Sequence, residues 1–327
     1  NPKTYRPDID GLRAIAVLSV LLFHFGVESF SGGFIGVDVF FVISGLLITR
    51  LILEAVGNES FTFGGFYLRR ARRLLPALLF TIFVSFTVGC FVFSPQHLER
   101  LGGSALHGIL SISNFFFWSE SGYFDAEARV KPLLHLWSLS VEEQFYFIWP
   151  LTLVLLQRAS ESRVTTPLIF ILLGVASWAF AEWFLKADPA GAFYLLPSRI
   201  VEFCMGAVMV WLVGINTPPW IRELALAIGL LLIGYAAIYF TNETSFPGTN
   251  SLIPCLGTSL AIFGGSSQYI GTLLRSKPMV FTGLISYSLY LCHWPIYVFY
   301  VYVTGSEKLE PLQIASLTVL SFIIATL

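Results

Sequence analysis

The sequence predicts an all-α protein, a polytopic transmembrane bundle of about ten spanning helices with a cytoplasmic N-terminus. Of its 327 residues, 56% are hydrophobic and only 12% are charged, whereas soluble domains carry about 25% charged residues. The mean hydropathy is +0.76. Apolar stretches of spanning length recur near residues 11–29, 34–54, 74–94, 137–157, 167–185, 194–214, 220–240, 250–267, 278–303 and 311–327. We therefore expect residues 1–327 to form one integral membrane domain.

The distribution of basic residues predicts the orientation of this bundle. One further stretch, residues 104–118, is short and carries several polar side chains, so we expect that it does not cross the membrane. With that stretch left out, most Lys and Arg residues lie on the side of the N-terminus, and Arg199 falls on the opposite side. The positive-inside rule then places both chain ends in the cytoplasm. Residues 95–136 become a long outer loop, and loops of that length are usually functional.

Composition also excludes some partners. The net charge is −1, and the chain contains no long basic tract of the kind that binds nucleic acid. The four cysteines lie in apolar segments without paired spacing, so the sequence predicts neither a disulfide framework nor a metal site.

The first two apolar stretches form a hairpin with an ionisable residue in each helix. His24 and Asp38 each lie seven residues from Ser31, and equal offsets from a turn predict equal depth in antiparallel helices. Ionisable groups inside apolar spans are costly and mark functional sites. A carboxylate beside an imidazole fixes its tautomer and supports the imidazolium, as a general base requires. We therefore expect His24 and Asp38 to meet, although His24 alone could equally be a packing hydrogen-bonder.

A dense arginine cluster precedes the third apolar stretch. Arg69 and Arg72 share one face of a helix, and Arg70 and Arg73 share another, because residues three apart are neighbours on the helix surface. Guanidinium forks match phosphate groups. The alternative is that the cluster only orients the protein or contacts anionic lipid. Arg13 lies at the same mouth of the bundle, about 16 Å along its helix from His24.

A polar segment leads from the outer loop into the fourth apolar stretch. Residues 132–146 contain an imidazole, an indole, a hydroxyl and two adjacent carboxylates, from His135, Trp137, Ser138, Glu142 and Glu143. A carboxylate facing lipid is poorly tolerated, so we expect these glutamates to face the protein interior. For Ser138, a helix N-cap is the alternative role.

Residues 286–295, in the ninth stretch, carry a ladder of hydroxyl groups followed by His293. We expect Pro295 to kink this helix. The hydroxyl groups could also be simple packing contacts between helices, which makes this segment the least specific of the four.

In this order and spacing, the segments resemble the acyltransferase-3 family of bacterial integral-membrane O-acyltransferases. The resemblance covers essentially the whole chain. Its matching features are Arg13 followed by His24, residues 36–45, the Arg69 and Arg72 pair, residues 137–146 and residues 293–295. It implies a multi-pass protein of the bacterial inner membrane, in contact with lipid. In many members of the family a further helix and a periplasmic SGNH-type domain follow, and we expect both beyond residue 327.

The resemblance also implies an activity. An acyl group, most often acetyl, would pass from cytoplasmic acyl-coenzyme A, with acetyl-CoA as the expected donor, to a hydroxyl of an extracytoplasmic carbohydrate acceptor such as O-antigen. Another acyl group, such as succinyl, or peptidoglycan as the acceptor are the close alternatives. A proton-coupled transporter is a more distant one, and the inverted repeat that it should show is absent from the hydropathy pattern.

The resemblance and the residues together define an expected site. The expected catalytic residues are His24, Asp38 and Glu142. The expected donor-binding residues are Arg13, Arg69 and Arg72. The expected acceptor-binding residues are His135, Trp137, Ser138, Glu143 and His293. His24 would either deprotonate the acceptor hydroxyl or first carry the acyl group itself, and the sequence leaves both routes open.

Overall fold

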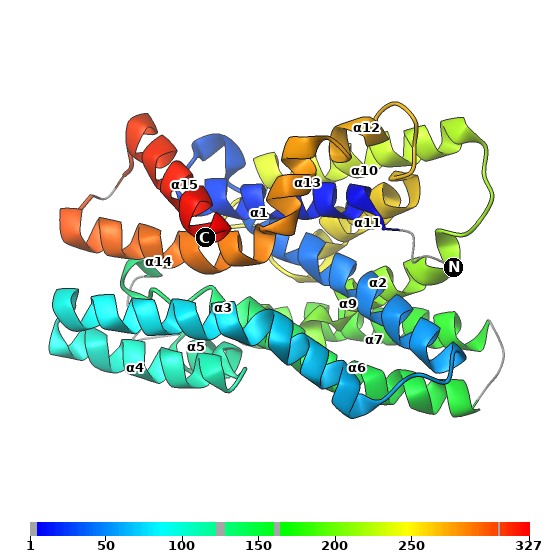
Figure 1. Ribbon diagram of the computed structural model, residues 1–327, viewed down its shortest axis with the longest axis horizontal. Helices are drawn as coiled ribbons and strands as arrows, with labels where there is room; N and C mark the ends of the chain where they lie inside the picture. The colour runs from blue at the N-terminus through cyan, green and yellow to red at the C-terminus, as the bar shows by residue number, and fades with distance from the viewer. Residues whose placement is uncertain (1–4, 122–127, 160–163, 307) are drawn as a thin grey trace.

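A computed structural model of the chain describes residues 5–121, 128–159, 164–306 and 308–327, and within these ranges it contains helices and no strand (Figure 1). This confirms the all-helical, polytopic class. The elements are α1 (Pro7–His24), η1 (Glu28–Phe30), η2 (Gly33–Ile35), α2 (Gly36–Gly57), α3 (Phe63–Val92), α4 (Pro95–Ile109), α5 (Ser113–Glu120), η3 (Ala128–Val130), α6 (Leu136–Ala159), α7 (Thr165–Ala187), α8 (Pro189–Tyr194), α9 (Leu196–Leu212), α10 (Pro219–Tyr239), α11 (Gly248–Gly264), α12 (Gly271–Leu274), α13 (Lys277–Leu284), α14 (Ser286–Thr304) and α15 (Pro311–Thr326).

Each of the ten predicted apolar stretches contains a helix, but fewer helices are clearly long and apolar enough to cross a membrane. Among the described residues, six qualify, and the bent pair α13 and α14 makes a seventh if it counts as one span. The other three stretches contain α1, α11 and α15. α11 and α15 are short, with 17 and 16 residues, and α1 carries charged side chains in its first half. The predicted count of ten spans stays a prediction.

The stretch 104–118 is divided between two helices. α4 packs against α3, and α5 packs against α6. With 15 residues, α4 is about 22 Å long, which is shorter than the hydrocarbon core of a bilayer, about 30 Å. Neither helix counts as a candidate span, as expected for this stretch. The membrane side on which the chain ends lie stays a prediction.

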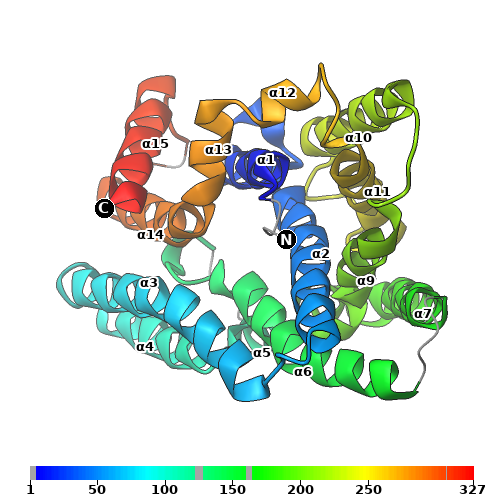
Figure 2. The same ribbon diagram turned by 45° about the vertical axis from the view of Figure 1, so that its right-hand side comes forward.

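α1 lies at the centre of the bundle. Leu12, Ala14, Ala16 and Val17 are fully buried, and the helix contacts α2, α11, α12, α13 and α14. Figure 2 shows it end-on, surrounded by these elements. A polar group on a helix in this position must find its partner inside the protein.

The ninth stretch is bent, but not at the expected proline. α13 and α14 meet at 69° around Ile285, ten residues before Pro295. α14 continues through Pro295 without ending. The backbone carbonyl that a proline leaves without its helical partner lies four residues earlier, and here that is Leu291. The Nε2 of His135 lies 3.1 Å from this oxygen. The side chain of His135, the residue before α6, therefore replaces the missing helix hydrogen bond.

Candidate active site

A cavity of about 90 Å³ lies between α1, α2, α3, α6 and α14, whose arrangement can be followed in Figure 2. One end is cationic, with three arginines, and the opposite end is formed by aromatic and hydroxyl side chains. The lining residues used below are Arg13, Phe40, Ser44, Leu47, Arg70, Arg73, Ser138, Glu142, Tyr146 and Tyr290. A cavity with one charged mouth and an apolar shaft suits a long ligand with an anionic head.

The cationic end is formed by Arg13, Arg70 and Arg73. The guanidinium of Arg70 lies over the rings of Tyr146, at 5.5 Å from the centroid, and Phe66, at 5.8 Å. These cation–π contacts hold the side chain against the bundle. Arg13 is oriented by Asp10, whose Oδ1 lies 3.6 Å from Arg13 Nη1.

The expected pair Arg69 and Arg72 lies elsewhere. Both side chains are exposed, and neither lines the cavity. The sequence correctly predicted two helix faces with two arginines each, but it favoured the wrong face for this cavity. The local sequence does not show which arginine pair faces the cavity. That depends on how α3 is rotated about its axis against α6. Whether Arg69 and Arg72 bind a ligand at the surface stays a prediction.

Glu142 lies within the cavity wall. Its carboxylate accepts hydrogen bonds from the hydroxyl groups of Ser44 and Tyr146. Two helices therefore meet at one carboxylate: α6 supplies Glu142 and Tyr146, and α2 supplies Ser44. Glu143, one residue later, lines two further hollows beside α3. As expected, both glutamates face protein rather than lipid.

The far end of the cavity is closed by Phe40, Ser138 and Tyr290. The hydroxyl oxygens of Ser138 and Tyr290 are 2.6 Å apart, and both hydroxyls lie 3.1 Å from the carbonyl oxygen of His135. Ser138 is inside the first turn of α6, so it is not the N-cap. The ring of Phe40 lies 6.3 Å from that of Tyr290.

Directly beyond Tyr290 lies a cluster of three imidazoles, from His24, His135 and His293. The ring of Tyr290 is 5.4 Å from His135 and 5.5 Å from His293. The Nδ1 of His24 is 2.8 Å from the Nε2 of His293, and these two rings are nearly parallel, at 8°. Trp294 completes the cluster, with its ring 4.4 Å from His24. His135 and His293 are buried, and His24 is partly exposed.

The predicted contact between His24 and Asp38 is wrong. Gly33 packs against the backbone of Ser19, and Gly36 packs against that of Ala16, so continuing this register places Asp38 level with Ala14. That is ten residues, or about 15 Å, from His24 along the helix. The chain reverses earlier than Ser31, just after α1, and residues 27–35 already run back beside it.

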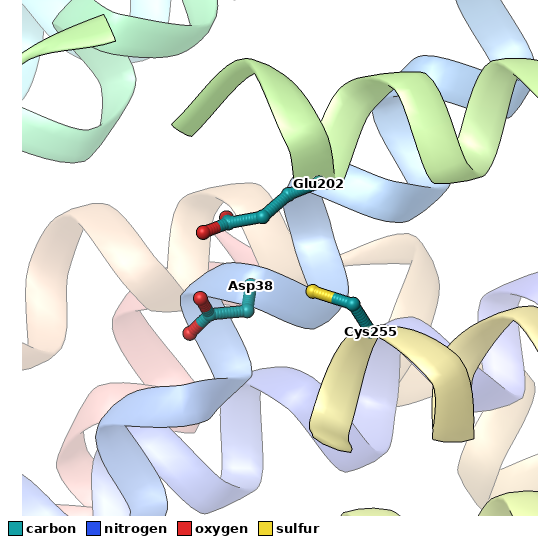
Figure 3. Close-up of side chains that lie close together, drawn as sticks. All are labelled: Asp38, Glu202 and Cys255. Atoms are coloured by element: carbon teal, nitrogen blue, oxygen red, sulfur yellow. The ribbon is translucent and has the colours of Figure 1, made fainter. Parts of the chain in front are cut away.

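Asp38 instead belongs to a fully buried ion cluster. The Nη1 of Arg199 is 2.8 Å from Glu202 Oε1 and 3.3 Å from Asp38 Oδ1, and the three side chains are at most 1% exposed. Figure 3 shows Asp38 and Glu202 converging with Cys255 from three helices. The three ligand atoms are close enough to hold a metal ion. However, the guanidinium already supplies the cation that the carboxylates need, so the residues fit an ion cluster better than a metal centre.

Arg199 was also misplaced by the sequence, which counted it as an outer, orienting charge. Its guanidinium is buried against the aromatic rings of Phe41, Trp137, Phe193 and Phe246, at 5.3–5.7 Å. Trp137 therefore packs on Arg199, and its contacts lie outside the histidine cluster. The signal that could have found Arg199 and Glu202 was the one applied to His24, namely an ionisable residue within an apolar stretch, here 194–214.

Comparison with known proteins finds one family model and several curated relatives. A family model described as an acyltransferase domain matches residues 6–327. YrhL of Bacillus subtilis is 36% identical over 310 residues, which are 90% of this chain and 49% of YrhL. The peptidoglycan O-acetyltransferase OatA of Listeria monocytogenes is 34% identical over 309 residues, 90% of this chain and 50% of that protein.

The O-acetyltransferase OatA of Staphylococcus aureus (strain NCTC 8325) is 31% identical over 312 residues, 90% of this chain and 51% of that protein. The chain therefore spans about half the length of these relatives. No solved structure matches it significantly.

Proposed function

The chain belongs to this acyltransferase family, and on that premise we propose that it transfers an acyl group, acetyl in the first place, from cytoplasmic acyl-CoA to a hydroxyl of an extracytoplasmic glycan. We propose peptidoglycan as the acceptor. The Listeria relative is named for that polymer, and no relative described above is named for O-antigen, the acceptor first expected. The SGNH-type domain expected beyond residue 327 stays a prediction.

One observation carries the proposal: a single cavity has arginines at one end and ends next to three imidazoles at the other. The phosphates of acyl-CoA cannot enter hydrocarbon, so they need a cationic mouth. Arg70, Arg73 and Arg13 provide it, with forks suited to phosphate oxygens. The narrow arm of the donor would extend along the shaft. Glu142 would accept hydrogen bonds from its amide groups, because a carboxylate can only accept.

The chemistry would occur at His24. The imidazole takes the proton of the acceptor hydroxyl as its oxygen bonds to the thioester carbon. The carbon–sulfur bond then breaks, and the departing thiolate receives that proton from the imidazolium. If His24 carries the acyl group first, its nitrogen bonds to the thioester carbon as the carbon–sulfur bond breaks and the thiolate departs. The acceptor oxygen then bonds to that carbon as the carbon–nitrogen bond breaks, and the hydroxyl proton passes through the freed imidazole nitrogen to the thiolate. Both routes use one imidazole nitrogen, so both need that nitrogen unprotonated at the start.

The cavity and the histidine cluster are adjacent but separate in this conformation. Phe40, Ser138 and Tyr290 lie between them. We propose that the acyl group passes when the side chains of Phe40 and Tyr290 change rotamer, which would join the shaft to the space around His24. Closure at other times would keep water and protons from crossing with no acceptor bound.

Two alanine variants of the full-length protein test the proposal in cells. His24→Ala should abolish acetyl esters on the glycan, measured by mass spectrometry of isolated peptidoglycan. His107→Ala is the matched control, because His107 is another helical imidazole, bonded to the carbonyl of Gly103 on α4, outside the cluster. Membrane insertion of both variants is checked by protease accessibility. Normal acetylation with His24→Ala would refute the proposal.

A further inference from the structure

We propose that His293 is a positioning residue that fixes the tautomer of His24, with the proton on Nδ1 and the reactive lone pair on Nε2. This inference rests on the proposed function for its catalytic meaning. The assignment of the proton itself rests only on the hydrogen bonds of the cluster.

The argument starts at the backbone of α14. The Nδ1 of His293 lies 2.7 Å from the carbonyl oxygen of Tyr290 and 3.1 Å from that of Leu289. A carbonyl oxygen can only accept, so this nitrogen must carry the proton. A neutral imidazole has one N–H group. The Nε2 of His293 is therefore an acceptor.

The same logic then passes to His24. Its Nδ1 is 2.8 Å from the Nε2 of His293, and that acceptor requires a donor. His24 must therefore hold its proton on Nδ1, which leaves its Nε2 without one. A buried hydrogen bond between two acceptors would cost the desolvation of both nitrogens, about 1–3 kcal/mol or more, so the opposite tautomer is disfavoured.

An imidazolium at His293 would reverse this chain, but the surroundings do not support a resting charge there. In the part of the chain that the structure describes, the hydrogen-bond partners of the three imidazoles are backbone carbonyls and one another, with no carboxylate. Charged groups without a compensating partner are strongly disfavoured in such sites. The cluster is therefore neutral at rest.

α14 also fixes the neighbouring rings. The carbonyl of Leu291, which Pro295 leaves free, accepts from Nε2 of His135. His135 is therefore held in the opposite tautomer, with a bare Nδ1 that has no partner among the described residues. Trp294 donates its indole N–H to the carbonyl of Lys131 over 2.9 Å. The centroid of its ring lies 4.4 Å from that of His24, close enough to stabilise the imidazolium that forms during transfer.

Nitrogen-15 NMR of the intact protein in lipid bilayers tests the assignment directly. The chain has five histidines, and the His24 signal is identified by its loss in His24→Ala. In the wild type we expect a protonated Nδ1 and a bare Nε2 on His24. The reverse pattern, or a doubly protonated ring at neutral pH, would overturn the proposal without any measurement of activity.

Two substitutions connect the tautomer to the rate. His293→Phe removes the acceptor, so we expect the His24 tautomer to become mixed and kcat to fall about 100-fold, with the KM for acyl-CoA unchanged. His293→Gln can offer an amide oxygen near the Nε2 position, so its kcat should be at least tenfold higher than that of His293→Phe. His107→Phe should change neither quantity.

The outcomes separate the two proposals. A His293→Phe variant with the wild-type rate or an unaltered His24 tautomer would refute the positioning role. A wild-type protein that shows the expected tautomer but acylates no glycan would refute the proposed function and leave the proton assignment standing.

Discussion

The two arginine pairs of α3 make competing predictions for the donor site, and a pair of double variants separates them. Replacing Arg70 and Arg73 by lysine keeps both charges and removes both guanidinium forks. Replacing Arg69 and Arg72 by lysine makes the same chemical change at two exposed positions that do not line the cavity. Because the positive-inside rule counts charge, both proteins should insert with the wild-type orientation.

The structure gives the expected size of the effect. Arg70 is partly buried and held over two aromatic rings, so its phosphate contact would be partly desolvated. A hydrogen bond to a charged group contributes about 1.5–3 kcal/mol. Arg73 is exposed, so its contact would contribute only about 0–1 kcal/mol. With about 2 kcal/mol lost at Arg70, Arg70→Lys/Arg73→Lys should weaken donor binding by about 2–3 kcal/mol, or roughly 30- to 150-fold in Kd. At exposed positions, charge pairs contribute about 0–1 kcal/mol, so Arg69→Lys/Arg72→Lys should change Kd by less than about fivefold.

Titration calorimetry with a non-hydrolysable acyl-CoA, on protein in lipid nanodiscs, measures the difference. Each variant is first shown to be folded by its thermal unfolding curve. A larger loss for Arg69→Lys/Arg72→Lys would return the donor site to the pair that the sequence favoured. Equal and small losses for both double variants would assign the whole cluster to membrane orientation and would leave the cavity without its donor.

Two further predictions concern the cavity wall and the ion cluster. Leu47→Trp should raise the KM for acyl-CoA about fivefold or more, because the larger side chain fills the shaft of the cavity. Phe147→Trp, on an exposed face of α6, should leave the KM unchanged. Equal KM values for the two variants would contradict the assignment of the cavity. Asp38→Leu should destabilise the protein by about 3–5 kcal/mol, because it removes one partner of the buried Arg199, and Glu202→Gln should cost less. Thermal unfolding in detergent measures both, and an unchanged midpoint for Asp38→Leu would contradict the buried ion pair.

The fold class and the positions of the helices could be predicted because they depend on local properties. Hydropathy over about twenty residues marks a helix whatever it packs against, and all ten apolar stretches contain one. The sequence also predicted that 104–118 does not span, but not that this stretch is divided between two helices. The bend at Ile285 was not predicted; α13 packs closely against α1 there, with Gly283 against the backbone of Asp10.

The candidate site was predicted in its members more than in its contacts. His24, His135 and His293 were each identified from the sequence, and the structure brings all three together. Nothing in the sequence pairs His24 with His293, since 269 residues separate them. Arg199 and Glu202 are also ionisable residues within an apolar stretch, the signal that identified His24. They were missed because Arg199, near a helix end, was interpreted as a charge that orients the protein in the membrane.

The error over Asp38 shows what the hairpin argument left undetermined. Counting from a turn requires the position of the turn, and a chain that reverses at residue 26 rather than 31 shifts every pair by ten residues. Depth alone is also insufficient, because a side chain on a central helix can face any of several neighbours. His24 faces α14, where its hydrogen bond and its aromatic contact come from adjacent residues, His293 and Trp294. The site therefore replaces the expected carboxylate with a neutral acceptor and a ring face. A neutral base held in this way needs no counter-charge before substrate binds. The arrangement therefore suits a position within the bundle, where an unpaired carboxylate would be costly.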